Sequence, residues 1–149
     1  MVSQSVLQKL TEMLGLFKVI QQISNSIYDT LQQQEEPEEM LLELLQQRTK
    51  FIEDVDVVYT VLEQGLQELI NHPELATEAE IEEIKNQREI TTELIKEIRE
   101  LDEKSLNWMQ QQKDNIALKL QQSRTSSKAH QAYLREEIYT EGWFIDQKK

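Results

Sequence analysis

The chain has no cysteine, only two prolines and three glycines among its 149 residues, and no long apolar run. The lack of cysteine excludes disulfides and thiol catalysis, and it fits a reducing compartment. So few prolines and glycines suit extended helices better than an α/β core with glycine-rich phosphate loops. With neither about 18 consecutive apolar residues nor a charged-then-apolar N-terminus, we expect a cytoplasmic chain without a membrane span or secretion signal.

Basic residues are also scarce, because 16 Lys and Arg stand against 28 Asp and Glu, a net charge of −12. This charge repels polyanions, so nucleic acid is not an expected partner. Residues 1–103 carry −15, whereas residues 104–149 carry +3. The basic tail could fold back on the acidic part of its own chain or dock on an acidic surface of another protein. A solvated charged surface with no role is the third reading.

The chain is rich in apolar residues spaced by three and four, which predicts an all-α protein. We expect helices over about residues 4–34, 38–70 and 78–128. The second apolar stripe repeats every 3.5 residues on average and includes Arg48, which is typical of coiled-coil-like antiparallel packing. The prediction is an antiparallel long-helix hairpin or three-helix bundle spanning residues 1–128. Residues 129–149 are expected to form a short C-terminal helix or tail that acts as a docking or regulatory segment.

Prolines and a capping motif set the helix boundaries. Pro37 stops the first helix and suits the first turn of the second. Pro73 ends the second helix, and Thr77 with Glu80 three positions later predicts a capping box at the start of the third. Gly15 lies inside the first helix, where it should cost about 1 kcal/mol relative to alanine.

The third predicted helix is longer than its two companions. About fifty residues would span roughly 75 Å, against about 45 to 50 Å for each of the others. We therefore expect an overhang of about 25 Å whose apolar side chains need a partner. The predicted partner-binding residues on this helix are Leu106, Met109, Ile116 and Leu120.

Four of the nine aromatic residues lie in the last twenty positions, where a frayed polar terminus would be usual. Aromatic side chains commonly anchor interfaces. These residues could pack back on the bundle as a fourth short helix or dock on a partner, and a reversible segment could do both. The tail residues predicted to bind a partner are Tyr133, Leu134, Trp143 and Phe144.

Three polar residues, Arg88, Asp102 and Ser105, fall within or beside the apolar face of the third helix. Charged residues in such positions either pair with a neighbour or mark a region of looser packing. The sequence does not choose between these two explanations.

No catalytic or cofactor-binding constellation is present in the sequence. A di-iron carboxylate bundle needs Glu three residues before each ligand histidine, whereas Leu69 precedes His72 and Ser127 precedes His130 at that spacing. A phosphorelay histidine would be compatible with a helical bundle, but neither histidine has a local setting that argues for it. We expect a protein that is not an enzyme and has no cofactor or metal site.

Four segments of the chain, residues 41–52, 95–102, 127–133 and 142–149, resemble parts of flagellar type III export chaperones of the FliT and FlgN kind. Residues 41–52 (LLELLQQRTKFI) resemble a helix signature of these chaperones, and residues 95–102 (IKEIRELD) resemble a second. Residues 127–133 (SKAHQAY) and 142–149 (GWFIDQKK) are similar to endings found in that group, on the FliT side more than the FlgN side. The order and spacing of these segments on a small, acidic, helical chain carry the resemblance.

The resemblance implies a cytoplasmic chaperone that holds a late flagellar substrate, such as the filament cap or a hook-filament junction protein. It further implies that the long helices hold an amphipathic terminal helix of the substrate. Delivery would be to the export gate at the membrane, with Tyr133 matching a tyrosine that takes part in gate docking.

Two alternatives come from other functional classes. The overhang could pair with a second copy, giving a homodimer that acts as a coiled-coil scaffold without chaperone activity. The acidic surface would also permit a regulatory protein that binds a transcription factor. Light scattering distinguishes the scaffold, because a monomer at tens of micromolar would count against it.

Overall fold

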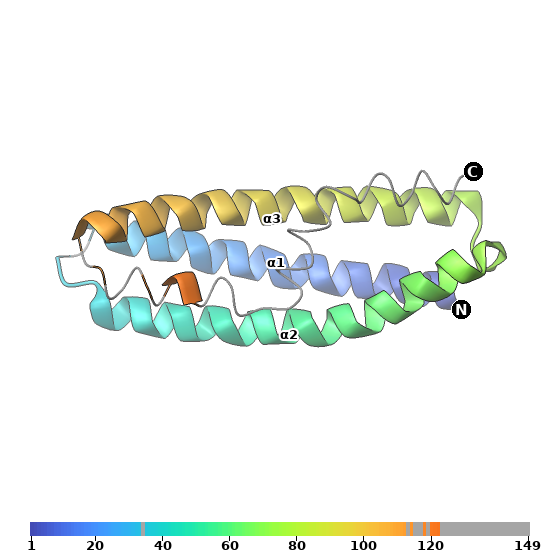
Figure 1. Cartoon of the computed structure of the whole chain (residues 1–149), viewed down its shortest axis with the longest axis horizontal. Helices are drawn as coiled ribbons and strands as arrows, with labels where there is room; N and C mark the ends of the chain where they lie inside the picture. Colours follow the sequence, from blue (N-terminus) through green and yellow to red (C-terminus); the bar gives the residue numbers. More distant parts are fainter. Residues whose placement is uncertain (34, 113, 115–117, 119, 123–149) are drawn as a thin grey trace.

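The computed structural model describes residues 1–33, 35–112, 114, 118 and 120–122 and is an all-α bundle, as predicted. Three long helices follow one another along the chain (Figure 1), with a short 3₁₀ helix before the last. Their bounds are α1 Val2–Gln33, α2 Glu38–Asn71, η1 Pro73–Leu75 and α3 Glu78–Gln112. Within the described residues, no helix combines the length and apolarity that a bilayer span requires.

The predicted prolines and capping box set the boundaries of α2 and the start of α3. Pro37 occupies the N-cap of α2, and its carbonyl accepts a 2.9 Å hydrogen bond from the Leu41 amide. At the start of α3 the Thr77 amide donates to Glu80 Oε1 at 2.9 Å, and the Glu80 amide donates to Thr77 Oγ1 at 3.1 Å. This reciprocal pair confirms the predicted capping box.

The capping box also joins the first and third helices. The Ser3 hydroxyl donates to Glu80 Oε2 at 2.7 Å, which ties the N-terminus of α1 to that of α3. The hydrogen bonds from the Thr77 backbone and then from Ser3 hold the pKa of Glu80 below its usual value. One carboxylate therefore caps a helix and fixes a helix pair.

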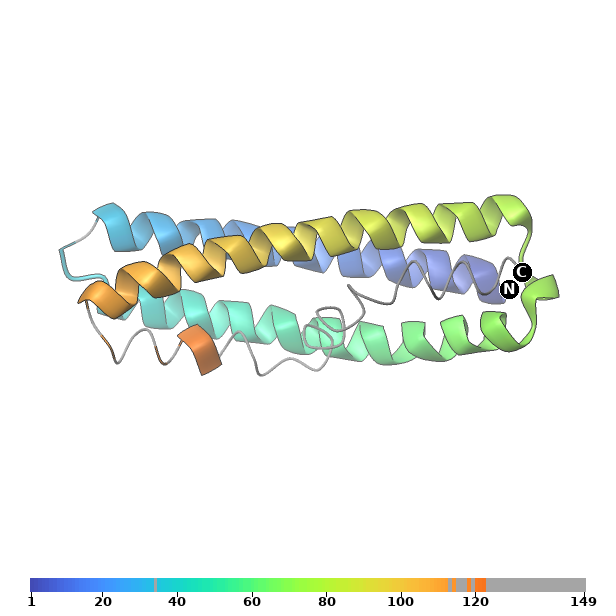
Figure 2. The same cartoon turned by 45° about the horizontal axis from the view of Figure 1, so that its top comes forward.

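The third helix ends earlier than predicted. α3 stops at Gln112 and has 35 residues, against 32 in α1 and 34 in α2. At 1.5 Å per residue all three span about 50 Å. Residues 120–122 lie back along the bundle, so the expected straight overhang is corrected as far as residue 122, whereas residues 123–128 lie outside the described residues. Residues 120–122 lie beside the first half of α2 in Figures 1 and 2. The physical reason for this position is the burial of Leu120, which is 1% exposed and packs into the bundle.

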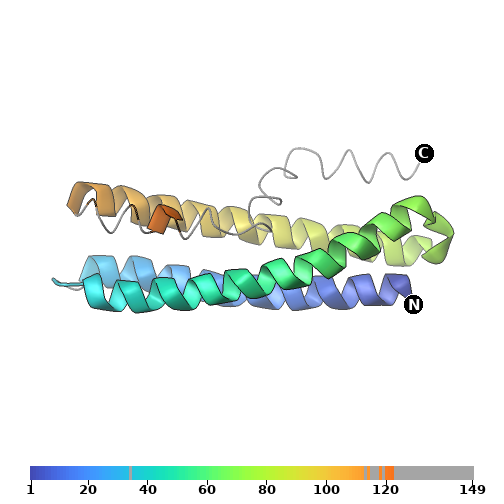
Figure 3. The same ribbon diagram turned by 60° about the horizontal axis from the view of Figure 1, so that its bottom comes forward.

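α1 is the central helix of the bundle. It packs along both α2 and α3, whereas those two helices have little direct backbone proximity within the described chain. Figure 3 shows α2 running obliquely across the bundle from one end to the other. A Cβ placed on Gly65 would lie 2.7 Å from Val6 Cγ2, so this glycine permits the close approach of α2 to α1.

The interior divides into two apolar clusters. The larger, here called the proximal core, lies toward the N-terminus of α1 and includes Phe17, Tyr59 and Ile98. The smaller, called the distal core, lies where α1 ends, α2 begins and α3 ends. The buried members of the distal core are Ile23, Ile27, Leu31, Leu41, Leu45, Met109 and Leu120.

Candidate functional site

The distal core contains those predicted partner-binding residues that the structure describes. Met109 and Leu120 are each 1% exposed, and the half-buried Leu106 and Trp108 pack against the distal core. The structure therefore brings Leu106, Met109 and Leu120 together, as the sequence pattern suggested. It also corrects the expectation that this stripe is uncovered. The predicted residues Ile116, Tyr133, Leu134, Trp143 and Phe144 lie outside the described residues.

Leu120 differs from the other members because it follows the end of α3. The rest of the distal core comes from three helices that begin or end at this level of the bundle. Burying one leucine side chain stabilises by about 1.5–3 kcal/mol relative to leaving it exposed. The distal core thus has three fixed walls and a fourth contributed by a single side chain from a separate stretch of chain.

A charged pair lies at the inner boundary of the distal core. Arg48 Nη2 of α2 is 2.5 Å from Asp102 Oδ2 of α3, and Arg48 Nε donates to Ser24 Oγ of α1 at 3.4 Å. The three residues are at most 2% exposed. For Asp102 this contact answers the question left open by the sequence, because its carboxylate pairs with a cation. The pair joins α2 to α3, which otherwise meet little.

The net contribution of a buried ion pair to the free energy of folding is close to zero. Removing two charges from water costs several kcal/mol for each ion, and their attraction roughly offsets that cost when the geometry is good.

Ser105 lies one turn beyond Asp102, and its buried Oγ has no hydrogen-bond partner among the described atoms. We call Ser24, Arg48, Asp102 and Ser105 the polar layer. On α2 and α3 it lies between the proximal and the distal core.

The sequence pattern placed Arg48, Asp102 and Ser105 within or beside apolar faces but did not pair them. A usable signal existed, since one positive and one negative charge each occupied a core position on a different helix. Arg48 lies ten residues after the start of α2 and Asp102 ten residues before the end of α3. Both are therefore about 15 Å from the distal end of the bundle. This match became visible only once the end of α3 was known.

The rest of the described surface offers no clear chemical site. A shallow hollow beside Gly65 is lined by apolar residues such as Val6 and Val61 and by the polar side chains of Ser5, Lys9, Gln64 and Glu68. His72 lies 3.4 Å from Glu74 in an exposed turn, and His130 lies outside the described residues. Across the described ranges, no group of three or more His, Asp or Glu side chains is placed to hold a metal ion.

Comparison with known proteins adds no relative to this picture. Neither a scan against family models nor searches of curated proteins and of solved structures found a match. The functional argument therefore depends on the distal core and the polar layer.

Proposed function

We propose that this chain is a cytoplasmic export chaperone, without catalytic activity or a cofactor, that binds a late flagellar substrate and delivers it to the type III export gate. The substrate is a filament cap or hook-filament junction protein, and it contributes an amphipathic terminal helix. The observation that supports this proposal is the distal core, where Leu120 completes an apolar site otherwise built by three helix ends.

The contact made by Leu120 illustrates what the site can accept. An apolar side chain from outside the three helices belongs to the same buried cluster as Ile27, Leu41 and Met109. A partner helix places apolar residues at three- and four-residue spacing and could fill the same walls once Leu120 leaves. Covering a few hundred Å² of apolar surface at about 25 cal/mol per Å² supplies several kcal/mol before association costs. That amount exceeds the contribution of one leucine and still allows release.

The resemblance of residues 41–52 and 95–102 to chaperone motifs concerns the same region. These segments contribute Leu41, Leu45 and Arg48 on α2 and Asp102 on α3. They therefore include the α2 wall of the distal core and both members of the charged pair beneath it. The resemblance and the geometry point to the same end of the bundle.

Co-purification with the substrate tests the proposal. Leu106→Asp places a charge on the half-buried rim of the distal core and should abolish capture of a purified filament cap or hook-filament junction protein. Ile90→Asp is the matched control, because Ile90 is an apolar residue of the same helix that is 54% exposed and away from the site. Circular dichroism checks that both variants remain helical. Equal capture by the two variants would eliminate this site.

Gate docking is tested separately from substrate capture. Tyr133 is the position that the resemblance assigns to the export gate. Tyr133→Ala should weaken binding to the purified gate component while leaving substrate capture unchanged. Loss of both activities, or of neither, would contradict that assignment.

The scaffold alternative depended on an apolar overhang of the third helix. α3 ends level with its companions, so the described residues provide no such overhang. We expect a monomer by light scattering at tens of micromolar. A stable dimer whose formation requires the distal end would support the scaffold in place of the chaperone.

A further inference from the structure

The polar layer interrupts the apolar interior of α2 and α3 at the same level. On α2, Leu45 belongs to the distal core and Ile52 to the proximal core, with Arg48 between them. On α3, Ile98 and Met109 belong to different cores, with Asp102 between them. On α1, Ser24 contacts Arg48 at this level but lies between Ile23 and Ile27, which both belong to the distal core. The half-buried Phe51 packs against both cores.

We propose that the polar layer divides the bundle into two units that open separately, and that the distal unit opens while the proximal unit stays folded. The distal unit consists of Ile23 together with residues 25–33, 38–47, 103–112 and 120–122. Its opening exposes the apolar walls that a partner helix would cover. That use of the opening rests on the proposed function, whereas the opening itself is a property of the chain alone.

The physical reason is that fraying of the bundle has a different free-energy cost when it stops at a charged layer than when it stops within an apolar core. A helix bundle that frays through a continuous core exposes further apolar side chains at each turn. Fraying that stops at Arg48 and Asp102 lets water reach two ions whose burial was costly, so part of the penalty is recovered. The proximal core keeps its own apolar contacts and the Ser3–Glu80 hydrogen bond at its far end. The distal core is smaller and has one wall made by a single leucine.

Hydrogen–deuterium exchange of the full chain without any partner tests the proposal. Amides of residues 25–33, 38–47 and 103–112 should exchange at least about tenfold faster than those of residues 6–20, 52–69 and 84–98. In low urea the distal amides should also show a weaker dependence on denaturant, because a sub-global opening exposes less surface than unfolding. Uniform exchange along all three helices would overturn the proposal. This measurement needs no variant, so it decides even where a substituted chain fails to fold.

A double substitution tests the role assigned to the charged pair. Arg48→Met together with Asp102→Leu replaces two ions by apolar side chains and joins the two cores. The ratio of distal to proximal exchange rates should then fall to within about threefold. An unchanged ratio in a folded double variant would show that the polar layer is not the boundary.

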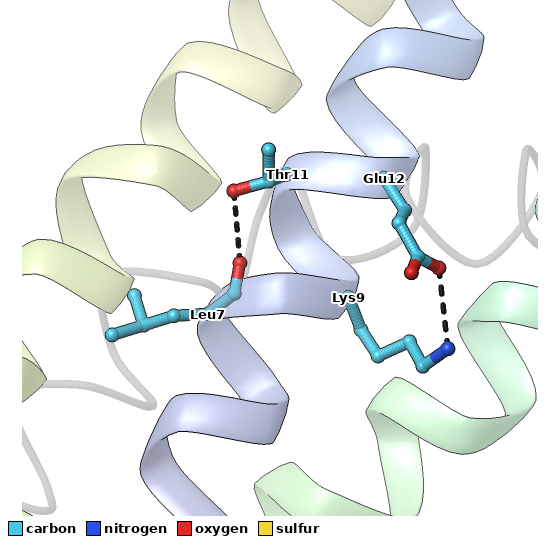
Figure 4. A network of polar contacts seen from close by, with 4 residues as sticks. All are labelled: Leu7, Lys9, Thr11 and Glu12. Atoms are coloured by element: carbon cyan, nitrogen blue, oxygen red, sulfur yellow. Dashed lines mark hydrogen bonds and ion pairs between the residues drawn. The ribbon is translucent and has the colours of Figure 1, made fainter.

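The exposed ion pair of α1 provides the matched control. Lys9 Nζ lies 3.2 Å from Glu12 Oε2 on the surface, beside a 3.0 Å hydrogen bond from Thr11 Oγ1 to the Leu7 carbonyl (Figure 4). Lys9→Gln with Glu12→Gln removes the same number of charges without touching either core. The control should leave the exchange ratio at its wild-type value, and a collapse of the ratio there would overturn the inference from the double variant. Because no partner is present, failure of the chaperone proposal and failure of this one are distinguishable.

Discussion

At the scale of single residues, two glycines in helices have opposite roles. A Cβ on Gly15 would meet no atom within 4 Å, whereas a Cβ on Gly65 would lie 2.7 Å from Val6 Cγ2. The first glycine only weakens α1, while the second lets α1 and α2 approach closely. The sequence shows the same residue type in both places, and only the packing distinguishes them.

Gly15→Ala should therefore raise the free energy of unfolding by about 0.5–1 kcal/mol through helix propensity. Gly65→Ala should lower it by about 1 kcal/mol or more, since the stiff Val6 side chain must shift. Urea unfolding followed by circular dichroism measures both. A stabilisation of similar size in the two variants would contradict the close approach of α2 to α1.

The charged pair is the second feature that belongs to the residue scale. Arg48→Met or Asp102→Leu alone leaves one buried charge without its counter-ion and should cost about 3–5 kcal/mol. The two substitutions together should leave the free energy of unfolding close to the wild-type value or above it. A thermodynamic double-mutant cycle checks this expectation. Additive losses would show that the two side chains do not act as a pair.

At the scale of elements, the helix starts were predictable and the end of α3 was not. Pro37 and the Thr77–Glu80 capping box fix the backbone locally, so the predicted boundaries there agree with the structure to within a residue. Nothing comparable follows Gln112, because residues 113–122 contain neither glycine nor proline. Helix propensity alone favoured continuation. The burial of Leu120 is a tertiary effect that no local pattern encodes.

The capping box gives a prediction at this scale. Thr77→Ala removes the hydroxyl that accepts from the Glu80 amide and should lower the free energy of unfolding by about 1 kcal/mol. Chemical denaturation of this variant measures the loss. A variant as stable as the wild type would mean that the cap is not used in solution.

Glu80 predicts a pH dependence of stability. Its pKa is lowered in the folded state from a usual value of 4.5, so the carboxylate stabilises the fold above that pH. This stabilisation is lost as the pH falls through the lower, folded-state pKa. The stability difference between wild type and Glu80→Gln should be largest near neutral pH and disappear in acid. Glu83→Gln, at an exposed position one turn along, is the control and should show no such difference.

At the scale of the whole molecule, the bundle is one set of three helices with two separate interiors. Sequence periodicity predicted the all-α class, the antiparallel order and which faces are apolar. It also grouped Leu106, Met109 and Leu120 correctly while placing them on an open surface. The error has one physical origin. The apolar periodicity of a helix does not show that a residue beyond the helix end, here Leu120, is buried against the bundle. The apolar residues that suggest a docking site are buried by contacts within the chain itself.

The central claim is that the distal core is a partner site that Leu120 covers. Leu120→Ala removes most of the covering side chain, a loss of roughly 2 kcal/mol at about 0.8 kcal/mol per methylene. Isothermal titration calorimetry of the full chain with the terminal helical segment of a purified filament cap or hook-filament junction protein measures the consequence. We expect the variant to bind about tenfold or more tightly than wild type. Equal affinities, or no binding by either protein, would contradict the claim.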